Sequence, residues 1–256
     1  MLQKPKISII TISFNAYSEG LENTIKSVIA QKNTHVEYLV IDGGSTDLSH
    51  DLYKQYRHHF DYFISEKDAG ISDAFNKGVK AASGDYIWFI NAGDYLNGDA
   101  INQVLEFIKT NKESIIYGDM FWLEQGRETL LIPASNYERK IKYVMPFLHP
   151  STIVSKKIFF DVGYFDLNLK RAMDYDLLLR SYLASHKARK IDYPLAYMVA
   201  GGVHDSDYLK TLKEVRCVSV KNGGNYLMAY LALVYTYLNK KSRLFCFIKE
   251  KVKVVL

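Results

Sequence analysis

Strand-like runs alternate with helix-like segments over the first 91 residues, and no other feature of the sequence constrains the fold as strongly. The strand-like runs are short, apolar and rich in β-branched residues; they cover residues 6–12, 36–42, 62–66 and 85–91. Segments with apolar residues spaced near 3.6 follow the first three runs. Strands and helices that alternate over short connections predict a parallel sheet with helices on its faces, and hence an α/β fold.

The carboxyl ends of these strands carry polar residues. In parallel α/β sheets, ligands bind at that edge; here it holds Ser13 and Asn15, Asp42 and Gly43, Glu66 and Asp68, and residues 91–94. The last of these ends, in WFINAGDYL, passes from an apolar strand directly into an amide, two small residues and a carboxylate. Asn, Gly and Asp also form ordinary turns. The position at the ligand edge favours a binding site over a turn alone.

The second half of the chain is less regular. The run IIYGDMFWLEQGRETLLI predicts two strands in a hairpin around Gln125-Gly126, and a helix is predicted from about Ala172 to His186, beside a mixed extension of the sheet. We expect one domain over residues 1–205 and a helical C-terminal extension over residues 206–256. In that extension, residues 227–238 are apolar but too few to span a bilayer, so they predict a core or interfacial helix.

The net charge lies at the end of the chain. The net charge is +5, and residues 240–256, KKSRLFCFIKEKVKVVL, contain six basic residues and one acidic residue, so the rest of the chain is formally neutral. A formally neutral domain argues against a basic groove, and we therefore expect no nucleic-acid partner. Two cysteines without metal-ligand spacing fit a reducing compartment, and the start of the chain shows no cleavable apolar leader, so we do not expect secretion.

Three short motifs contain carboxylates suited to chemistry. In DGGSTD, Asp42 fits a contact with a base or a ribose hydroxyl, or a loop that caps a helix; Gly-Lys-Ser or Gly-Lys-Thr, the mark of a P-loop, is absent from it. Asp94 fits a divalent cation that also binds a diphosphate. In AMDYDLLLR, two acids begin a helix, as helix caps or with one acting as a general base. Asp174 and Asp176 do not share a helix face, so we expect one to be catalytic and the other structural.

Together, these motifs resemble those of family 2 glycosyltransferases, which have the GT-A fold. The resemblance spans about residues 6–200 and rests on ISIITISFNA, LENTIKSVIAQ, VEYLVIDGGSTD, GISDAFNKGVKAASGDYIWFINAGDYL, HPSTIVSKKIFFDVGYFD and MDYDLLLR. Within the family, the chain is most similar to bacterial enzymes of surface-polysaccharide assembly. The resemblance implies a mostly parallel nucleotide-binding sheet flanked by helices. It also implies an inverting enzyme that moves a sugar from a nucleotide-diphosphate sugar to an acceptor hydroxyl, with Mg²⁺ or Mn²⁺ as cofactor.

The same resemblance assigns roles to individual residues. It places the donor on Ile12, Ser13, Asp42, Asp73, Asn76, Lys77, Asn91, Ala92 and Gly93. It makes Asp94 the final acid of the metal motif and Asp174 the general base. His204 is a second candidate for the metal or the diphosphate, or a surface-loop residue. His149 matches an acceptor-side position, or is a buried structural histidine.

Two departures from the family pattern affect these roles. The metal motif of relatives offers two or three carboxylates, whereas Asn91 and Gly93 occupy the earlier positions here and leave Asp94 alone. This leaves open whether the enzyme depends on a metal. Met173 stands where many relatives have Glu, so Asp174 is the acid that matches the base motif.

The basic tail predicts a further partner. As a helix, residues 244–255 would align Leu244, Ile248, Val252 and Val255 on one face. Such a helix suits an anionic membrane surface, or it docks on the domain with its lysines solvated. We expect a glycan or lipid-linked glycan acceptor and a cytoplasmic protein that is peripheral on the inner face of the cell membrane.

Two other functions stay open. A sugar nucleotidyltransferase shares this kind of fold, but such enzymes carry a glycine-rich loop with basic residues after the first strand, and SFNAYSEG has no basic residue. The other alternative is a non-catalytic partner that binds a nucleotide sugar or acts as a scaffold in an assembly complex, which the reduced metal motif favours. Turnover, as opposed to donor binding alone, separates this partner from an enzyme.

Overall fold

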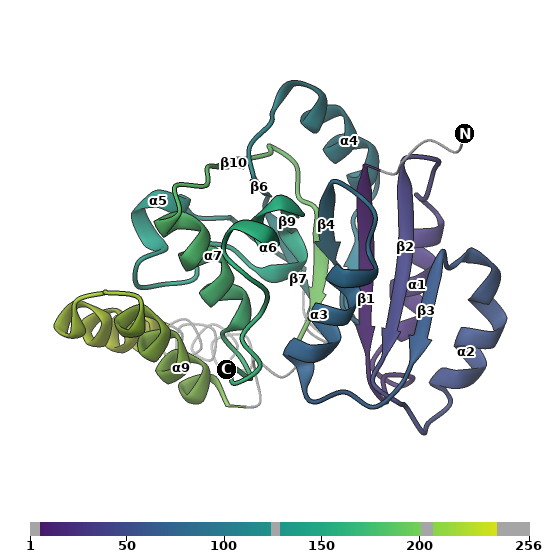
Figure 1. Cartoon of the computed structure of the whole chain (residues 1–256), viewed down its shortest axis with the longest axis horizontal. Helices are drawn as coiled ribbons and strands as arrows, with labels where there is room; N and C mark the ends of the chain where they lie inside the picture. Colours follow the sequence, from purple (N-terminus) through teal and green to yellow (C-terminus); the bar gives the residue numbers. More distant parts are fainter. Residues whose placement is uncertain (1–5, 124–128, 201–206, 240–256) are drawn as a thin grey trace, which may run out of the picture.

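The computed structural model describes residues 6–123, 129–200 and 207–239. A central seven-stranded sheet has helices on both faces, and a four-stranded sheet lies beside it (Figure 1). The strand order of the large sheet is β10-β6-β9-β4-β1-β2-β3. These strands are β1 (Ile7–Ser13), β2 (Val36–Asp42), β3 (Tyr62–Ser65), β4 (Tyr86–Phe89), β6 (Ile115–Tyr117), β9 (Thr152–Ser155) and β10 (Ala188–Lys190).

The register of the large sheet brings the predicted ligand edge together. β1 is parallel to β2 and β4, and β2 is parallel to β3. Ser13 pairs with Asp42, and Asp42 pairs with Ser65, so three strands end side by side. β9 is antiparallel to both β4 and β6, which is the mixed extension that the sequence predicts. The predicted α/β fold with a mostly parallel sheet is confirmed.

The small sheet corrects one prediction. Its order is β5-β11-β7-β8, with β5 (Tyr95–Leu96), β7 (Met120–Leu123), β8 (Leu130–Ile132) and β11 (Ala196–Val199). β7 and β8 pair antiparallel as predicted. The described residues of 115–132 form three strands instead of two, because β6 belongs to the large sheet. Gly118 lies between β6 and β7, where the chain passes close to Tyr193: a Cβ at this position would lie 2.7 Å from the carbonyl oxygen of Tyr193, so glycine fits there. Gln125-Gly126 lies outside the described residues.

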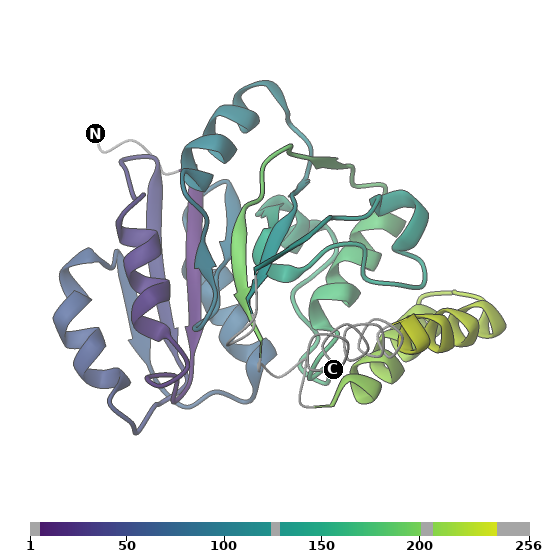
Figure 2. The ribbon, with the colours of Figure 1, turned by 180° about the vertical axis from the view of Figure 1, so that it is seen from behind.

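Helices cover both faces of the large sheet (Figures 1 and 2). The described helices are α1 (Leu21–Ile29), α2 (Ser49–Tyr56), α3 (Ile71–Ala81), α4 (Ala100–Thr110), α5 (Tyr137–Lys140), α6 (Lys157–Asp161), α7 (Met173–Leu183) and α9 (Tyr208–Lys221), with 3₁₀ turns η1 (Arg57–His59) and η2 (His149–Ser151). Residues 226–239 are also helical. Strand side chains alternate between two cores: Ile9 packs in the one that includes α1 and α4, and Ile10 in the one that includes α3 and α7.

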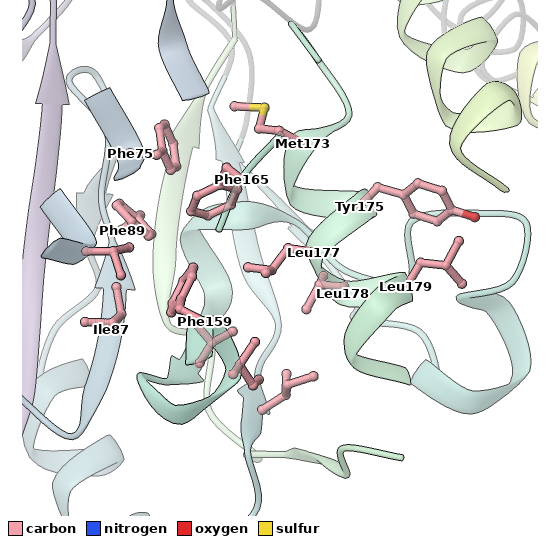
Figure 3. Close-up of a cluster of buried hydrophobic side chains, with 14 of the residues drawn as sticks. Phe75, Ile87, Phe89, Phe159, Phe165, Met173, Tyr175, Leu177, Leu178 and Leu179 are labelled. Carbon is pink, nitrogen blue, oxygen red and sulfur yellow. The ribbon is translucent and has the colours of Figure 1, made fainter. Parts of the chain in front are cut away.

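The second core joins the sheet to the C-terminal half. Figure 3 shows Phe165 between the strand residue Phe89 and Leu177 of α7. Val215 and Val218 of α9 belong to the same cluster, so α9 packs on α7. The division at residue 205 stays a prediction. Among the described residues, no helix has both the length and the apolar character needed to cross a bilayer.

Candidate active site

Asp42 is fully buried and organises the loop after β2. Its carboxylate accepts hydrogen bonds from Ser45 N (3.0 Å), Tyr53 Oη (2.9 Å) and Ser65 Oγ (2.5 Å), and also from Ser45 Oγ. Tyr53 Oη lies 2.8 Å from Ser13 Oγ, which ties the ends of β1 and β2 to α2. Four donors satisfy a carboxylate well. A direct bond from Asp42 to a nucleotide base would therefore require one of these donors to give way.

Backbone hydrogen bonds join the loops at this edge. Gly43 N donates to Ser13 O (2.9 Å), and Ala92 N donates to Ile12 O (3.1 Å). The Ile12 side chain packs against the core, and the Ile12 carbonyl oxygen is the group that accepts the hydrogen bond from Ala92. A Cβ on Gly43 would lie 2.8 Å from Asp68 Oδ2, so glycine gives the Asp68 carboxylate room to lie over the loop. The loops after β1, β2 and β4 thus form one connected surface.

Lys77 of α3 lies among three carboxylates. Its Nζ is 2.6 Å from Asp68, 2.8 Å from Glu66 and 3.5 Å from Asp73. Partial burial acts to lower the pKa of Lys77, but the bonds to Asp68 and Glu66 outweigh it and raise that pKa overall. Asp73 accepts a hydrogen bond from Ala69 N (3.0 Å), and this bond, with the charge of Lys77, lowers the Asp73 pKa. The group therefore places a cation within an acidic rim at the end of β3.

Asn76 links α3 to the segment before α7. Its Nδ2 donates to Phe165 O and its Oδ1 accepts from Phe165 N, both at 3.0 Å, and the residue is 6% exposed. Both polar atoms of the side chain therefore bind this chain. The contact with the donor that the resemblance implies stays a prediction, and the structure gives Asn76 a further role in positioning residues 163–172.

The segment WFINAGDYL ends in a tight turn clamped by α1. Asp94 N donates to Asn91 O (3.0 Å), and Gly93 adopts φ 99°. Glycine is required there, because a Cβ would lie 2.9 Å from Glu19 O. Thr24 Oγ1 accepts from Gly93 N (3.0 Å) and donates to Asp94 O (2.6 Å). The role of Thr24 was not predicted from the sequence, although a hydroxyl on the buried face of an amphipathic helix was a usable signal.

Asp94 is a buried carboxylate with few partners. It is 8% exposed, and its Oδ1 accepts one long hydrogen bond, 3.3 Å from Val199 N. Burial raises its pKa to about 7. In the same turn, Asn91 Oδ1 is buried and accepts no hydrogen bond from the residues that the structure describes. Two oxygen acceptors with unmet capacity fit a hard divalent cation.

The protein offers few ligands for such a cation. Across the described ranges, no three His, Cys, Asp or Glu side chains are grouped to hold a metal. Mg²⁺ commonly uses one or two carboxylates, with phosphate oxygens and water completing its shell. The residues present therefore fit a cation that the donor's diphosphate helps to bind. His204 lies outside the described residues.

Asp174 lies in the first turn of α7, beside the end of β4. Its Oδ1 accepts from Tyr175 N (2.7 Å), and its Oδ2 is 4.0 Å from His149 Nδ1. The His149 ring packs against Phe75 of α3 and Phe89 of β4, with ring centroids 5.0 and 5.5 Å apart. Asp174 and His149 line a small, mostly apolar cavity with Phe89, Phe165 and Leu177, among others. Residues from α7, η2 and β4 thus meet next to the Asn91 turn.

Asp176 has a structural role. It is 2% exposed, and its Oδ2 accepts from Arg180 Nε at 2.8 Å. The Arg180 guanidinium also donates to Gly163 O (3.2 Å), Tyr164 O (2.9 Å) and Val162 O, which fixes the end of α6. Of the two acids, Asp174 therefore borders the cavity and Asp176 supports the fold, as we expected for a catalytic and a structural pair. The catalytic role itself stays a prediction.

Glu214 of α9 holds the start of α7, a role that was not predicted from the sequence. Its carboxylate accepts from three successive backbone N–H groups: Lys170 (3.2 Å), Arg171 (2.7 Å) and Ala172 (2.6 Å). A carboxylate at this place satisfies free donors and complements the dipole of α7. Capping patterns are local, and Glu214 is 42 residues from Ala172. Periodicity therefore gave no signal for it.

Comparison with known proteins places the chain in an established family. The sequence pattern of glycosyl transferase family 2 matches residues 8–173. The chain is 34% identical over 191 residues to an uncharacterized glycosyltransferase of Mycobacterium tuberculosis (strain ATCC 25618 / H37Rv), covering 72% of this chain and 71% of the relative. The chain belongs to glycosyl transferase family 2, and it is a glycosyltransferase. The family and the enzyme class that the sequence predicted are confirmed.

Other relatives are named for polysaccharide synthesis. Over 225 residues the chain is 27% identical to the amylovoran biosynthesis glycosyltransferase AmsB of Erwinia amylovora, covering 79% of this chain and 74% of AmsB. It is 36% identical over 110 residues to the putative teichuronic acid biosynthesis glycosyltransferase TuaG of Bacillus subtilis, covering 41% and 42%. The crystal structure of residues 1–349 of S. aureus TarS with UDP-GlcNAc superposes with a TM-score of 0.67 at 20% identity, covering 89% of this chain and 70% of that fragment. This likeness confirms the predicted GT-A fold.

Proposed function

We propose that this glycosyltransferase transfers a sugar from a nucleotide-diphosphate donor to a glycan or lipid-linked glycan acceptor, with inversion of configuration at the anomeric carbon. We place this reaction in bacterial surface-polysaccharide assembly. One observation carries the proposal: Asp174 lies beside the end of β4, from which the Asn91–Asp94 turn begins. The proposed base and the proposed diphosphate site would thereby lie next to each other. The names of AmsB and TuaG support polysaccharide assembly, and the UDP-GlcNAc bound to TarS supports a nucleotide-sugar donor.

The proposed reaction is a single displacement. The acceptor hydroxyl gives its proton to a carboxylate oxygen of Asp174. Its oxygen attacks the anomeric carbon of the donor sugar from the face opposite the diphosphate. The bond from that carbon to the diphosphate oxygen breaks, and the electron pair leaves with the nucleoside diphosphate. Attack from the opposite face inverts the configuration.

Donor binding uses the connected loops. Ser13 and Asp42 lie at the ends of β1 and β2, where we expect the nucleotide base to bind. We expect Asp73 and Lys77 to contact the ribose and diphosphate. In the structure, the positive charge of Lys77 is compensated by ion pairs with Glu66 and Asp68. We expect Lys77 to exchange one of these contacts for a phosphate oxygen when the donor binds. Of the two small residues in the turn, Ala92 is partly exposed and can approach the diphosphate, whereas Gly93 is buried and its N–H binds Thr24.

Asp94 and Asn91 would hold Mg²⁺ or Mn²⁺ on the diphosphate side of the site, and His204 is a second candidate ligand. When bound, the cation supplies positive charge that neutralises the leaving diphosphate. The raised pKa of Asp94 means that an adjacent cation would compete with a proton for this carboxylate. Metal-dependent donor binding should therefore strengthen as the pH rises through about 7.

We further propose that the protein works in the cytoplasm, bound peripherally to the inner face of the cell membrane through residues 240–256. This segment lies outside the described residues, and its six basic residues support the proposal. Removing it should abolish co-sedimentation with anionic vesicles at low salt while donor binding is retained. Equal vesicle binding by the truncated and complete chains would contradict this role.

A panel of nucleotide sugars tests the enzymatic proposal. A bound donor should raise the unfolding temperature in the presence of Mg²⁺ or Mn²⁺, and it should be hydrolysed slowly without an acceptor. The Asp174→Asn variant should show the same thermal shift with lost hydrolysis. Binding without turnover, with every acceptor tried, would instead identify a non-catalytic nucleotide-sugar-binding partner. Formation of a nucleotide sugar from a nucleoside triphosphate and a sugar phosphate would identify a nucleotidyltransferase.

A further inference from the structure

The helix at residues 226–239 exposes an uncovered apolar face. Five large side chains follow the spacing i, i+3, i+4, i+8 and i+11, which places them on one side of a helix. They are Leu227, Tyr230, Leu231, Tyr235 and Leu238, with exposed fractions between 47% and 67%. We call these five residues the 227–238 face. Scattered exposed apolar residues are normal, whereas a continuous stripe of this kind marks an interaction surface.

The opposite side of the helix attaches it to the protein. Ala229, which is 2% exposed, points away from the 227–238 face and is the one buried residue of the described helix. Arg216 of α9 lies over the Tyr226 ring, 5.5 Å from its centroid, and Asn225 Oδ1 accepts from Met228 N (3.1 Å) at the start of the helix. These contacts fix the direction in which the helix leaves α9. The 227–238 face is therefore presented outward by a defined anchor.

We propose that the 227–238 face binds the surface of an anionic membrane, with the helix lying in the plane of the interface. The helix is about 21 Å long at 1.5 Å per residue, too short to cross the hydrocarbon core. It has no charged residue from Asn225 to Asn239. Leucine and tyrosine together suit the boundary between acyl chains and headgroups, because the tyrosine ring is apolar and its hydroxyl reaches water.

Charge distinguishes a membrane from other occupants. Residues 240–256, which continue directly from the helix, carry six basic residues and one acidic residue, while the rest of the chain is formally neutral. Anionic lipid headgroups complement this segment. A second copy of the chain would instead bring two strongly basic segments to one interface, where they repel. Charge complementarity therefore favours lipid over self-association.

The position of the helix agrees with this partner. The helix at residues 226–239 and the carboxyl ends of β1–β3 both lie in the lower half of Figures 1 and 2. The helix and the candidate active site thus lie in the same half of the molecule. The inference rests on the proposed function for a lipid-linked acceptor, but membrane binding itself needs no turnover.

The test compares full-length variants on vesicles of phosphatidylcholine with and without phosphatidylglycerol. The double substitution Leu227→Ser and Leu231→Ser should lower the partition coefficient for anionic vesicles by about tenfold or more. The matched control changes Leu130 and Leu131 of β8 to serine; they are 54% and 52% exposed and belong to the small sheet. This control should bind vesicles like the parent, and both variants should keep the parent's donor-dependent thermal shift.

Several outcomes would overturn the inference. It fails if the parent does not bind anionic vesicles, or if the 227/231 variant binds them as well as the parent. It also fails if light scattering shows a parent dimer that this variant converts to a monomer, because the occupant is then a second copy. A large drop in the variant's unfolding temperature, with no vesicle binding by the parent, would mean that the face packs within the chain. Vesicle binding by a protein without turnover would refute the proposed function and leave this inference intact.

Discussion

Replacing Glu214 with alanine tests how α9 supports the candidate base. The substitution removes the acceptor of three backbone N–H groups at residues 170–172, directly before Asp174 in α7. Hydrogen bonds to a charged group contribute about 1.5 to 3 kcal/mol each, and loss of a helix cap costs about 0.5 to 2 kcal/mol. Because the three bonds share one partly exposed carboxylate, they are not additive, and water replaces part of the loss. We expect Glu214→Ala to lower the free energy of unfolding by about 2 to 3 kcal/mol.

Thermal unfolding and turnover measure the two consequences. For a chain of this size, about 2 to 3 kcal/mol corresponds to a fall in Tm of about 4 to 12 °C. A shift of about 1 Å at a catalytic group costs up to about a hundredfold in rate, so we expect kcat to fall by about tenfold or more below the new Tm, with the donor KM nearly unchanged. Glu214→Gln keeps one acceptor oxygen and should be intermediate. Lys213→Ala, an exposed neighbour in α9, should match the parent.

The pattern of results separates the possible roles of Glu214. Loss of stability together with a normal kcat would show that Glu214 supports the fold without positioning Asp174. An equal loss of donor affinity and kcat would place the effect at the donor site. If Tm and kcat both stay within error of the parent, the reasoning from the three hydrogen bonds is refuted.

Three further predictions concern the acids of the site. Asp174→Asn should lower turnover by about a hundredfold or more while donor binding persists, and equal activity in steady-state assays would exclude Asp174 as the base. Asp94→Ala should weaken donor binding in the presence of Mg²⁺ or Mn²⁺, as measured by calorimetry; affinity that is indifferent to both metal and substitution would exclude the metal role. Burial raises the pKa of Asp94 from 3.8 to about 7, so between these values the folded protein keeps a proton that the unfolded chain has lost. The free energy of unfolding of the metal-free protein should therefore fall from about pH 4 to about pH 7 and then level off. Denaturant unfolding across this range should show a smaller fall in Asp94→Asn, and identical pH profiles would contradict the shift.

The sequence alone determined the fold class and predicted the edge of the sheet that holds the candidate site. Hydrophobic periodicity is a local property, and the alternation of strands and helices therefore predicted a parallel α/β sheet with Asp42 and Asp94 at strand ends. The order of the motifs predicted the family. The tight turn in WFINAGDYL was also readable, because Gly93 and Asp94 directly follow an apolar strand.

Only the tertiary structure decided what these residues contact. Asp42 is saturated by Tyr53 and Ser65 from neighbouring elements, Asn76 binds Phe165, and Thr24 clamps the Gly93 turn. Each contact joins residues that are distant in the chain, and spacing carries no information about such pairs.

The same reason explains the remaining errors and omissions. β6 and β7 read as one strand because both are apolar, and pairing with different sheets separates them. Glu214 looked like one more polar residue of an amphipathic helix until packing of α9 on α7 brought it to Ala172. Exposure of the helix at residues 226–239 was equally undetermined, since an apolar helix of that length fits a core as well as an interface. Local patterns determine which elements form, and long-range packing determines which of their side chains meet.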